Sequence, residues 1–330
     1  MLLLHAPQPE ELAFKQQMLA DPATMAYNHA WGGVIPFPRE RWADWHARWV
    51  GQPEGRFYRY LQDGDSGAFV GEIAWHRDGK TGRPLADVIV HAPFRGRGYG
   101  REGLALLCAA AREAGLTVLY DDMAADNPAA GLFRAFGFTE EGRTAQTILL
   151  KKDLTVSPLA DRPREIPTPR LLLRPLEDAD AADVTALLCD GQINQTYMLP
   201  DFSAPEEALP LFRRLRDLSR APDHLIYGAE LQGRIIGYLN DVRLENNGLE
   251  VGYVMSPAHW NRGYCTEMLA AVRDALFRLG FAALRAGYFE GNHASRRVME
   301  KCGLRPTGET ETIAYRGKDR KVICMALLRE

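Results

Sequence analysis

The stretch FRGRGYGREG at residues 94–103 holds four glycines and three arginines, and HWNRGYCTEM at residues 259–268 is a weaker copy of it. Both copies keep the same spacing: a bulky residue, then a glycine three positions later, then a small residue two positions after the glycine. These positions are Arg95, Gly98 and Gly100 in the first copy, and Trp260, Gly263 and Cys265 in the second. Glycine lets backbone N–H groups turn toward one point, and a helix that begins there adds its partial positive charge. The sequence therefore predicts two loops that each bind a phosphate or pyrophosphate.

The repeat extends well beyond the two loops. Gly71, Gly98 and Gly137 in the first half keep step with Gly237, Gly263 and Gly303 in the second. A repeat of this length indicates a duplicated domain. Between the halves, SPLADRPREIPTPR at 157–170 has four prolines and predicts a semi-extended linker. We expect an N-terminal domain over 1–156, a linker over 157–168 and a C-terminal domain over 169–330.

Each loop is followed by a predicted helix. Apolar residues recur with helical spacing after both loops, at Leu104, Leu107, Cys108 and Ala111, and at Leu269, Val272, Leu276 and Leu279. A strand follows each helix, and Asn127 or Asn292 then predicts the N-cap of a shorter helix. Each half is thus expected to be an α/β unit with a strand, a glycine loop, a helix, a strand and a helix at its centre.

Composition limits the class of protein. The chain is 46% hydrophobic and 25% charged, with a net charge of −3, so neither nucleic acid nor membrane binding is expected. The start, MLLLHAPQPEEL, predicts no signal peptide, and no stretch is apolar enough for a membrane span. Five scattered cysteines without a CxxC pair indicate reduced thiols, no metal site and a cytoplasmic protein.

A nicotinamide dinucleotide site is an alternative, because Gly98–Gly103 is a literal GxGxxG and Asp121 or Asp122 ends the next strand. Three features disfavour it. The preceding strand ends near Val90, well before the loop; the domain lacks a further βαβ unit; and Cys265 breaks the motif in the second copy.

The retained pattern resembles a known family. VHAPFRGRGYG at 90–100 resembles the acetyl-CoA pyrophosphate loop of the GNAT (Gcn5-related) N-acetyltransferases, and DNPAAGLFRAFGF at 126–138 resembles their next helix motif. In the second half, 168–180, 250–268 and 291–304 resemble the RimJ/RimL type. The resemblance implies an α/β (α+β) fold of two tandem GNAT-like domains, each a mixed, mostly antiparallel sheet flanked by helices. It also implies an acetyl-CoA-dependent N-acetyltransferase.

The resemblance places acetyl-CoA along the strand end, loop and helix start of each half. The implied cofactor residues are Ile89, Val90, Arg95, Gly96, Arg97, Gly98, Tyr99, Gly100 and Asn127 in the first half, and Val254, Met255, Asn261, Arg262, Gly263, Tyr264, Cys265, Thr266 and Asn292 in the second. Backbone N–H groups near Val90 and Met255 are expected to stabilise the oxyanion, and Arg95 and Arg97 to contact phosphate. Asn292 has a second interpretation, a plain helix cap.

Direct transfer needs a neutral amine, which costs a lysine-like acceptor about 4 kcal/mol at pH 7. The resemblance makes Glu250 the candidate base and Ser295 the candidate acid of the second half; a solvated carboxylate and an ordinary helix serine are the alternatives. In the first half Asp87 is the candidate base, but Phe133 stands where many relatives have a tyrosine acid. We therefore expect the C-terminal domain to be catalytic, with a degenerate scaffold as one alternative for the N-terminal domain.

The acceptor is less defined by sequence. Tyr27, Trp31 and Tyr197 are candidate substrate residues, whereas the helical spacing of Trp42, Trp45 and Trp49 (42–49) favours a buried helix face. The expected partner is a small-molecule amine or a protein N-terminus. The chain is expected to be a monomer whose halves imitate a dimer, or a homodimer. A non-catalytic, regulatory CoA-binding protein remains the alternative from another functional class.

Overall fold

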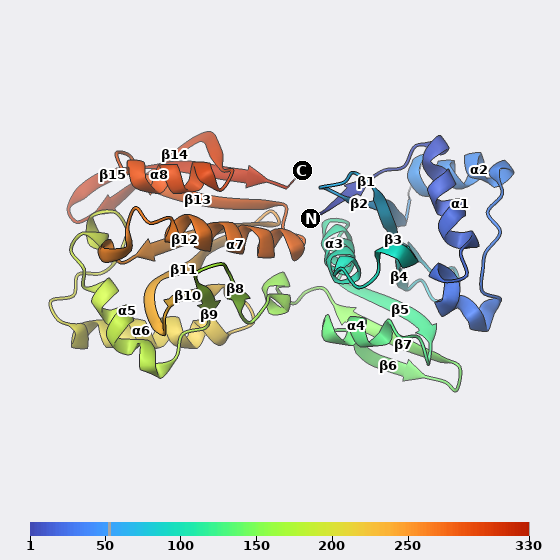
Figure 1. The fold of residues 1–330 in the computed structure, drawn as a ribbon, viewed down its shortest axis with the longest axis horizontal. Coiled ribbons are helices and arrows are strands. Elements are labelled where there is room, and N and C mark those ends of the chain that lie inside the picture. Colours follow the sequence, from blue (N-terminus) through green and yellow to red (C-terminus); the bar gives the residue numbers. More distant parts are fainter. Residues whose placement is uncertain (52–53, 330) are drawn as a thin grey trace. The chain divides into compact units, whose positions relative to one another are not determined.

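The computed structural model describes residues 1–51 and 54–329, with the side chains of Ala30 and Trp31 also outside the described part. The chain divides into two compact units, Met1–Val156 and Ser157–Glu330 (Figure 1). In the described residues, each unit contains one mixed sheet that is antiparallel except for a single parallel pair. This confirms the expected fold class.

The first sheet has the order β1-β2-β3-β4-β5-β7-β6. Its strands are β1 (Leu2–His5), β2 (Arg56–Asp63), β3 (Phe69–Arg77), β4 (Pro84–Val90), β5 (Val118–Ala124), β6 (Thr139–Arg143) and β7 (Thr147–Asp153). Its helices are α1 (Leu12–Ala20), α2 (Trp42–His46), α3 (Tyr99–Glu113) and α4 (Ala130–Ala135). One face packs against α3 and α4, and the other against α1, α2 and the aromatic residues around them (Figure 1).

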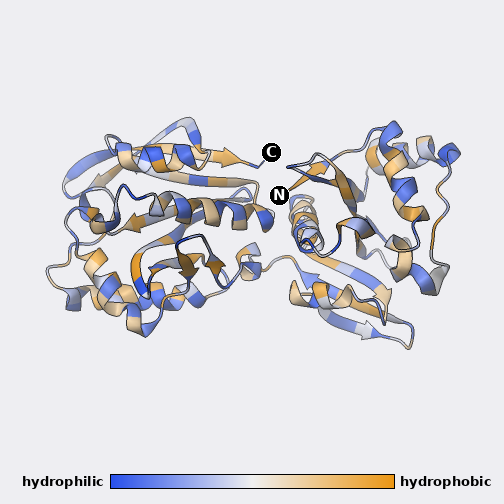
Figure 2. Cartoon of the chain, in the orientation of Figure 1, coloured by the Kyte–Doolittle hydropathy of each residue, from blue (hydrophilic) through white to orange (hydrophobic). Residues whose placement is uncertain are grey.

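The second sheet has the order β14-β15-β13-β12-β11-β10-β9-β8. Its strands are β8 (Ile166–Pro167), β9 (Leu172–Arg174), β10 (Ile226–Leu231), β11 (Arg234–Glu245), β12 (Gly248–Met255), β13 (Ala283–Phe289), β14 (Arg305–Tyr315) and β15 (Lys318–Leu328). Its helices are α5 (Ala181–Leu188), α6 (Pro205–Arg220), α7 (Tyr264–Arg278) and α8 (His293–Lys301). Helices α7 and α8 cover one face, and α5 and α6 the other. Figure 2 shows apolar segments in the strands that lie between these two layers of helices.

In both units the parallel pair separates where the glycine loop approaches. Strand β12 pairs with β13 only over Gly248–Glu250, and β4 pairs with β5 only at Leu85 and Tyr120. Beyond these points the last residues of β4 and β12 have no paired strand on that side within the described part of the chain. Each sheet therefore opens into a V next to its loop.

The glycines that keep step between the halves have a structural reason. An added Cβ at Gly71 would lie 2.2 Å from the carbonyl oxygen of Ile89, and one at Gly237 would lie 2.5 Å from that of Val254. Each glycine thus permits close packing against the strand that leads into the loop. The N-capping expectation holds for Asn292, whose side chain accepts from the N–H of Ser295. It is wrong for Asn127, because the N-cap of α4 is Ala129, whose own N–H donates to the Asn127 side chain.

The segment predicted as a linker is part of the second unit. A short 3₁₀ turn spans Pro158–Asp161, β8 pairs with β9, and Leu159 is 1% exposed within the second core. The sequence analysis missed this because a single buried leucine shows no periodicity. No helix in the described part of the chain is both long and apolar enough to cross a bilayer.

Candidate cofactor and acceptor sites

The last residue of each inner strand directs its N–H toward the opening of the V. The N–H of His91 donates to the carbonyl of Val70, and that of Ser256 to Ile236. Because N–H groups alternate between the two edges of an antiparallel strand, those of Val90 and Met255 point the other way. Each strand therefore presents one backbone donor to whatever lies between β4 and β5 or between β12 and β13.

The bulky residue retained in both loops fastens the loop to its own strand. Nε of Arg95 donates to the carbonyl of Val90 at 3.2 Å, and Nε1 of Trp260 donates to that of Met255 at 2.6 Å. Arg95 also donates to the carbonyls of Ala23 and Thr24. Three of its N–H donors are thus engaged by backbone carbonyls, and the expected contact of Arg95 with phosphate stays a prediction.

Each loop ends at a helix start with free donors. Gly96 and Gly98 have φ of 78° and 84°, and Asn261 and Gly263 have φ of 58° and 80°. The helices α3 and α7 that follow have no side-chain N-cap. Their first N–H groups therefore point out of the helix end, an arrangement suited to a pyrophosphate. Arg170 supports the second loop through the carbonyl of Arg262 and the carboxylate of Glu267.

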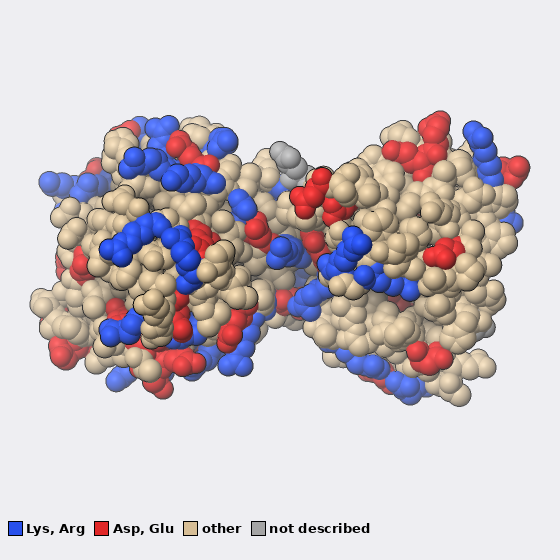
Figure 3. Space-filling view, viewed as in Figure 1, with Lys and Arg blue, Asp and Glu red and all other residues tan. Residues whose placement is uncertain are grey.

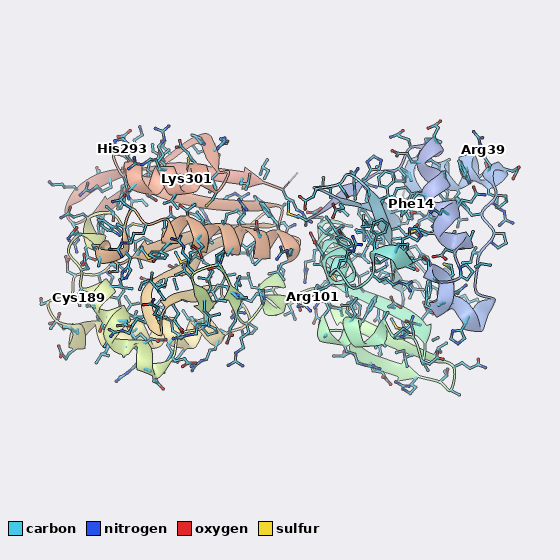
Figure 4. All side chains as sticks on the ribbon, viewed as in Figure 1. Phe14, Arg39, Arg101, Cys189, His293 and Lys301 are labelled. Atoms are coloured by element: carbon cyan, nitrogen blue, oxygen red, sulfur yellow. The ribbon has the colours of Figure 1, made fainter. Side chains whose placement is uncertain are left out.

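A cavity of about 420 Å³ lies in the V of the second unit. It is lined by the end of β12, the loop, the start of α7 and one side of α8. Arg297 and Lys301 of α8 line it and have no ion-pair partner in the described chain. Figure 3 shows basic side chains over α8, and Lys301 is labelled in Figure 4. Backbone donors and two free cations fit a phosphate-bearing ligand such as CoA.

Ser295 lines this cavity beside a residue that the sequence analysis missed. The hydroxyl of Tyr253 on β12 lies 2.8 Å from Oγ of Ser295 on α8. Burial raises the pKa of Tyr253 well above its ordinary value, so the phenol stays protonated. The signal available in the sequence was a tyrosine in the buried alternation of Val251 and Met255, next to the glycine loop.

The structure does not bring Glu250 into the cavity. Its carboxylate lies 3.0 Å from a guanidinium nitrogen of Arg243, which also contacts Glu311. Glu250 stands at the closed end of the V, where β12 and β13 are still paired. On the acceptor face, Tyr197 lines the cavity and donates to Oδ1 of Asn240 at 2.7 Å.

The first unit has a larger cavity of about 830 Å³ in its V. Three carboxylates line it, from Asp87 on β4 and from Asp121 and Asp122 on β5. Nδ1 of His76 lies 3.7 Å from the carboxylate of Asp87, and this proximity raises the pKa of His76. Phe133 also lines the cavity, but its ring is 3% exposed and can donate no proton.

The acceptor face of the first unit already holds an ammonium group. Nζ of Lys15 lies 2.7 Å from the carboxylate of Glu72, and 4.9 Å and 5.0 Å from the ring centroids of Trp45 and Tyr58. A neighbouring cavity of about 540 Å³ is lined by the same residues together with Asp87. Carboxylates and aromatic faces of this kind bind cationic amines.

Most of the residues predicted from sequence line one of these cavities. The exceptions among the described side chains are Arg97, Arg262 and Glu250. The Arg97 guanidinium lies 5.6 Å from the ring centroid of Phe94. Tyr27 lines both cavities of the first unit, whereas the side chain of Trp31 lies outside the described part. Within the described residues, no group of three or more His, Cys, Asp or Glu is placed to hold a metal ion.

The chain matches known proteins across both halves. The family model described as an acetyltransferase (GNAT) domain matches residues 1–139 and again 170–305. The chain is 27% identical over 153 residues to the protein named uncharacterized N-acetyltransferase YoaA of Bacillus subtilis (strain 168), covering 45% of this chain and 86% of YoaA. It is 31% identical over 143 residues to YkkB of the same organism, covering 42% of this chain and 83% of YkkB. A GNAT-family acetyltransferase structure from Bacillus anthracis matches with a TM-score of 0.44 and 22% identity, covering 50% of this chain and 98% of that one.

Proposed function

The chain belongs to the GNAT acetyltransferase family, and we propose that it carries out acetyl-CoA-dependent N-acetylation of an amine, with the second domain catalytic. The acceptor is a small-molecule amine or a protein N-terminus. The observation that carries the proposal is the cavity of the second domain, where a free N–H of Met255, an uncapped helix start and the Tyr253–Ser295 pair meet.

The residues present fit acetyl-CoA. The first N–H groups of α7 and the side chains of Arg297 and Lys301 would hold the phosphates. The N–H of Met255 would hold the acyl oxygen and stabilise the negative charge that develops there. Acetyl-CoA supplies an activated acetyl group and, when that group leaves, a thiol.

In this proposal Ser295 supplies the proton that the leaving sulfur needs. Its Oγ accepts from or donates to the Tyr253 hydroxyl, and its N–H is held by the side chain of Asn292. Since burial favours the protonated phenol, Tyr253 can restore the serine proton after transfer; the amine releases its proton to solvent, and the phenol regains one from solvent. Glu250, paired with Arg243, is not placed to take the amine proton without a rearrangement of that ion pair.

The experiment is a transfer assay with labelled acetyl-CoA. The chain is incubated with a panel of small amines and with peptides that carry a free N-terminus, and amide products are identified by mass. The proposal expects a product with at least one of these classes. Binding of acetyl-CoA without transfer to any amine would instead support the non-catalytic, CoA-binding alternative.

A further inference from the structure

The two domains differ at the residues that line their openings. Arg95 donates to the carbonyl of Val90, and Trp260 donates to that of Met255, so Val90 and Met255 are equivalent positions in the two domains. With the parallel pairs Leu85–Tyr120 and Glu250–Arg285, this alignment makes three pairs of positions equivalent. These pairs are Asp87 with Gly252, Val88 with Tyr253, and Asp121 with Ala286. The first domain thus has carboxylates where the second has glycine and alanine, and no hydroxyl where the second has Tyr253.

Asp121 is the less expected of the two carboxylates. The residue is 8% exposed, lines the first cavity, and has no hydrogen-bond or ion-pair partner among the described residues. Its equivalent in the second domain, Ala286, is 2% exposed in the apolar core. Burying a carboxyl without a partner costs stability, so packing gives no reason for an aspartate here.

The two carboxylates lie on opposite faces of the sheet. Asp121 is two residues from both Leu119 and Met123, so all three side chains lie on the same face of the sheet. Leu119 and Met123 pack in the core beneath α3, so Asp121 faces the helix that follows the glycine loop. Asp87 lies between Ala86 and Val88, whose side chains pack in that same core. Because neighbouring side chains of a strand point to opposite faces, Asp87 faces the acceptor side. One carboxyl therefore faces the cofactor side of the V and the other the acceptor side.

We propose that Asp121 is the general acid of a second active centre in the first domain, which gives its proton to the sulfur of CoA while Asp87 takes the proton of the amine. The proposal rests on the proposed function, because it assigns the same reaction to the first domain. Phe133 has no hydroxyl to donate, and in this proposal Asp121 supplies the proton instead. The first domain is then an enzyme with its own proton donor.

The surroundings keep Asp121 in the form that such a role needs. Burial, and after it the nearby carboxylates of Asp87 and Asp122, raise the pKa of Asp121 well above its ordinary range. Tyr27, from the turn Thr24–Trp31, is the other titratable group that faces it, and burial raises the pKa of that phenol too. This shift favours the carboxylic acid form of Asp121, which is the form that can donate a proton.

An alkylammonium acceptor first releases one proton to solvent, and the transfer from the neutral amine then balances with these two groups. The amine nitrogen forms the C–N bond with its lone pair, and the C–S bond breaks with its electrons on sulfur. Asp87 takes one proton from nitrogen, and Asp121 gives one proton to sulfur. Passage of a proton from Asp87 to Asp121 then restores both groups. The acceptor class is an alkylammonium. The acceptor face already binds a group of this kind, the side-chain ammonium of Lys15.

The test uses the full chain with the second loop disabled by Gly263→Glu, labelled acetyl-CoA, and spermidine and n-butylamine as acceptors. Asp121→Asn keeps the shape of the side chain but cannot donate a proton, and we expect turnover to fall roughly 100-fold or more. Asp153→Asn is the control, since Asp153 lies at the exposed end of β7 outside both cavities. It should change turnover less than about threefold.

A second readout does not depend on turnover. The infrared carbonyl band of a protonated carboxylic acid should be present at pH 7 in the parent and in Asp122→Asn, and absent in Asp121→Asn. Unchanged turnover in Asp121→Asn, a band that survives this substitution, or no first-domain turnover with either amine would each overturn the proposal. A parent chain that fails to bind acetyl-CoA at all would instead overturn the proposed function.

Discussion

The hydroxyl of Tyr253 lies 2.8 Å from Oγ of Ser295 and joins strand β12 to helix α8 across the second cavity. In the proposed function the two hydroxyls act as one proton-donating unit rather than as two separate side chains. Neither partner is a charged group, so the unit works without a shifted carboxylate. Its role can be tested by removing each hydroxyl in turn.

In a chain with the first loop disabled by Gly98→Glu, Ser295→Ala should lower kcat roughly 100-fold, because the leaving sulfur loses its proton donor. Tyr253→Phe should lower kcat less, since the serine hydroxyl remains. The KM for acetyl-CoA should stay within about threefold in both variants. Steady-state kinetics with Ser203→Ala, an exposed serine before α6, provides the control. Unchanged kcat in Ser295→Ala would contradict the role.

Arg95→Ala should weaken acetyl-CoA binding to the first site. The substitution leaves the carbonyls of Val90, Ala23 and Thr24 without their donor, at a cost of about 1–3 kcal/mol, or roughly 5- to 100-fold in affinity. Arg97→Ala is the matched control, because the Arg97 side chain contacts the ring of Phe94 and interacts with Tyr99 but is not bonded to these three carbonyls. Calorimetry should find a smaller loss in Arg97→Ala, and one that vanishes at high salt. Equal losses in the two variants would mean that Arg95 acts by charge alone.

Lys15→Met should destabilise the first domain by roughly 3–5 kcal/mol, because it leaves the buried carboxylate of Glu72 without its cation, with the Tyr58 hydroxyl as its remaining donor. The double variant Lys15→Met, Glu72→Gln should recover much of this loss. Denaturation monitored by tryptophan fluorescence measures both, since Trp45 contacts the lysine. Additive losses in the double variant would show that the ion pair contributes no coupling.

Asp121→Ala should raise the melting temperature of the first domain, and more at pH 8 than at pH 4. The native pKa of Asp121 is raised above its unfolded value of about 3.9, so the native state binds more protons and wild-type stability falls as pH rises. Asp153→Asn should show the opposite trend. Hydrogen bonds from Thr155 lower the pKa of Asp153, and the stability they give is lost as pH falls. Calorimetric melting at both values of pH compares them.

The fold could be predicted from sequence because its determinants are local or repeated. Glycine spacing gave the duplication, and the close approach of Gly71 and Gly237 explains why that spacing persists. The geometry of the two glycine loops was predictable for the same reason, since it depends on backbone and on a helix start, whereas their binding of the cofactor stays a prediction. Asn292 was predictable as a cap because capping involves residues close in sequence.

The surroundings of the candidate catalytic side chains were harder to predict, because they depend on contacts between distant segments. Arg95 looks like a phosphate ligand in sequence, and only the fold shows that backbone carbonyls occupy it. Tyr253 and Ser295 are 42 residues apart, and no periodicity links them. In the sequence Asp121 resembled the acidic residue of a dinucleotide site. In the fold it lines the first cavity, at the opening of the sheet, where we propose a role in acetyl transfer.

Isothermal calorimetry of acetyl-CoA binding tests the central claim most directly, with the parent chain and the variants Gly98→Glu and Gly263→Glu. The account predicts two sites in the parent, and the loss of one site in each variant, because both glycines take a positive φ at their loops. A single site lost only with Gly263→Glu would leave the first domain as a scaffold. No binding in the parent would contradict the account as a whole.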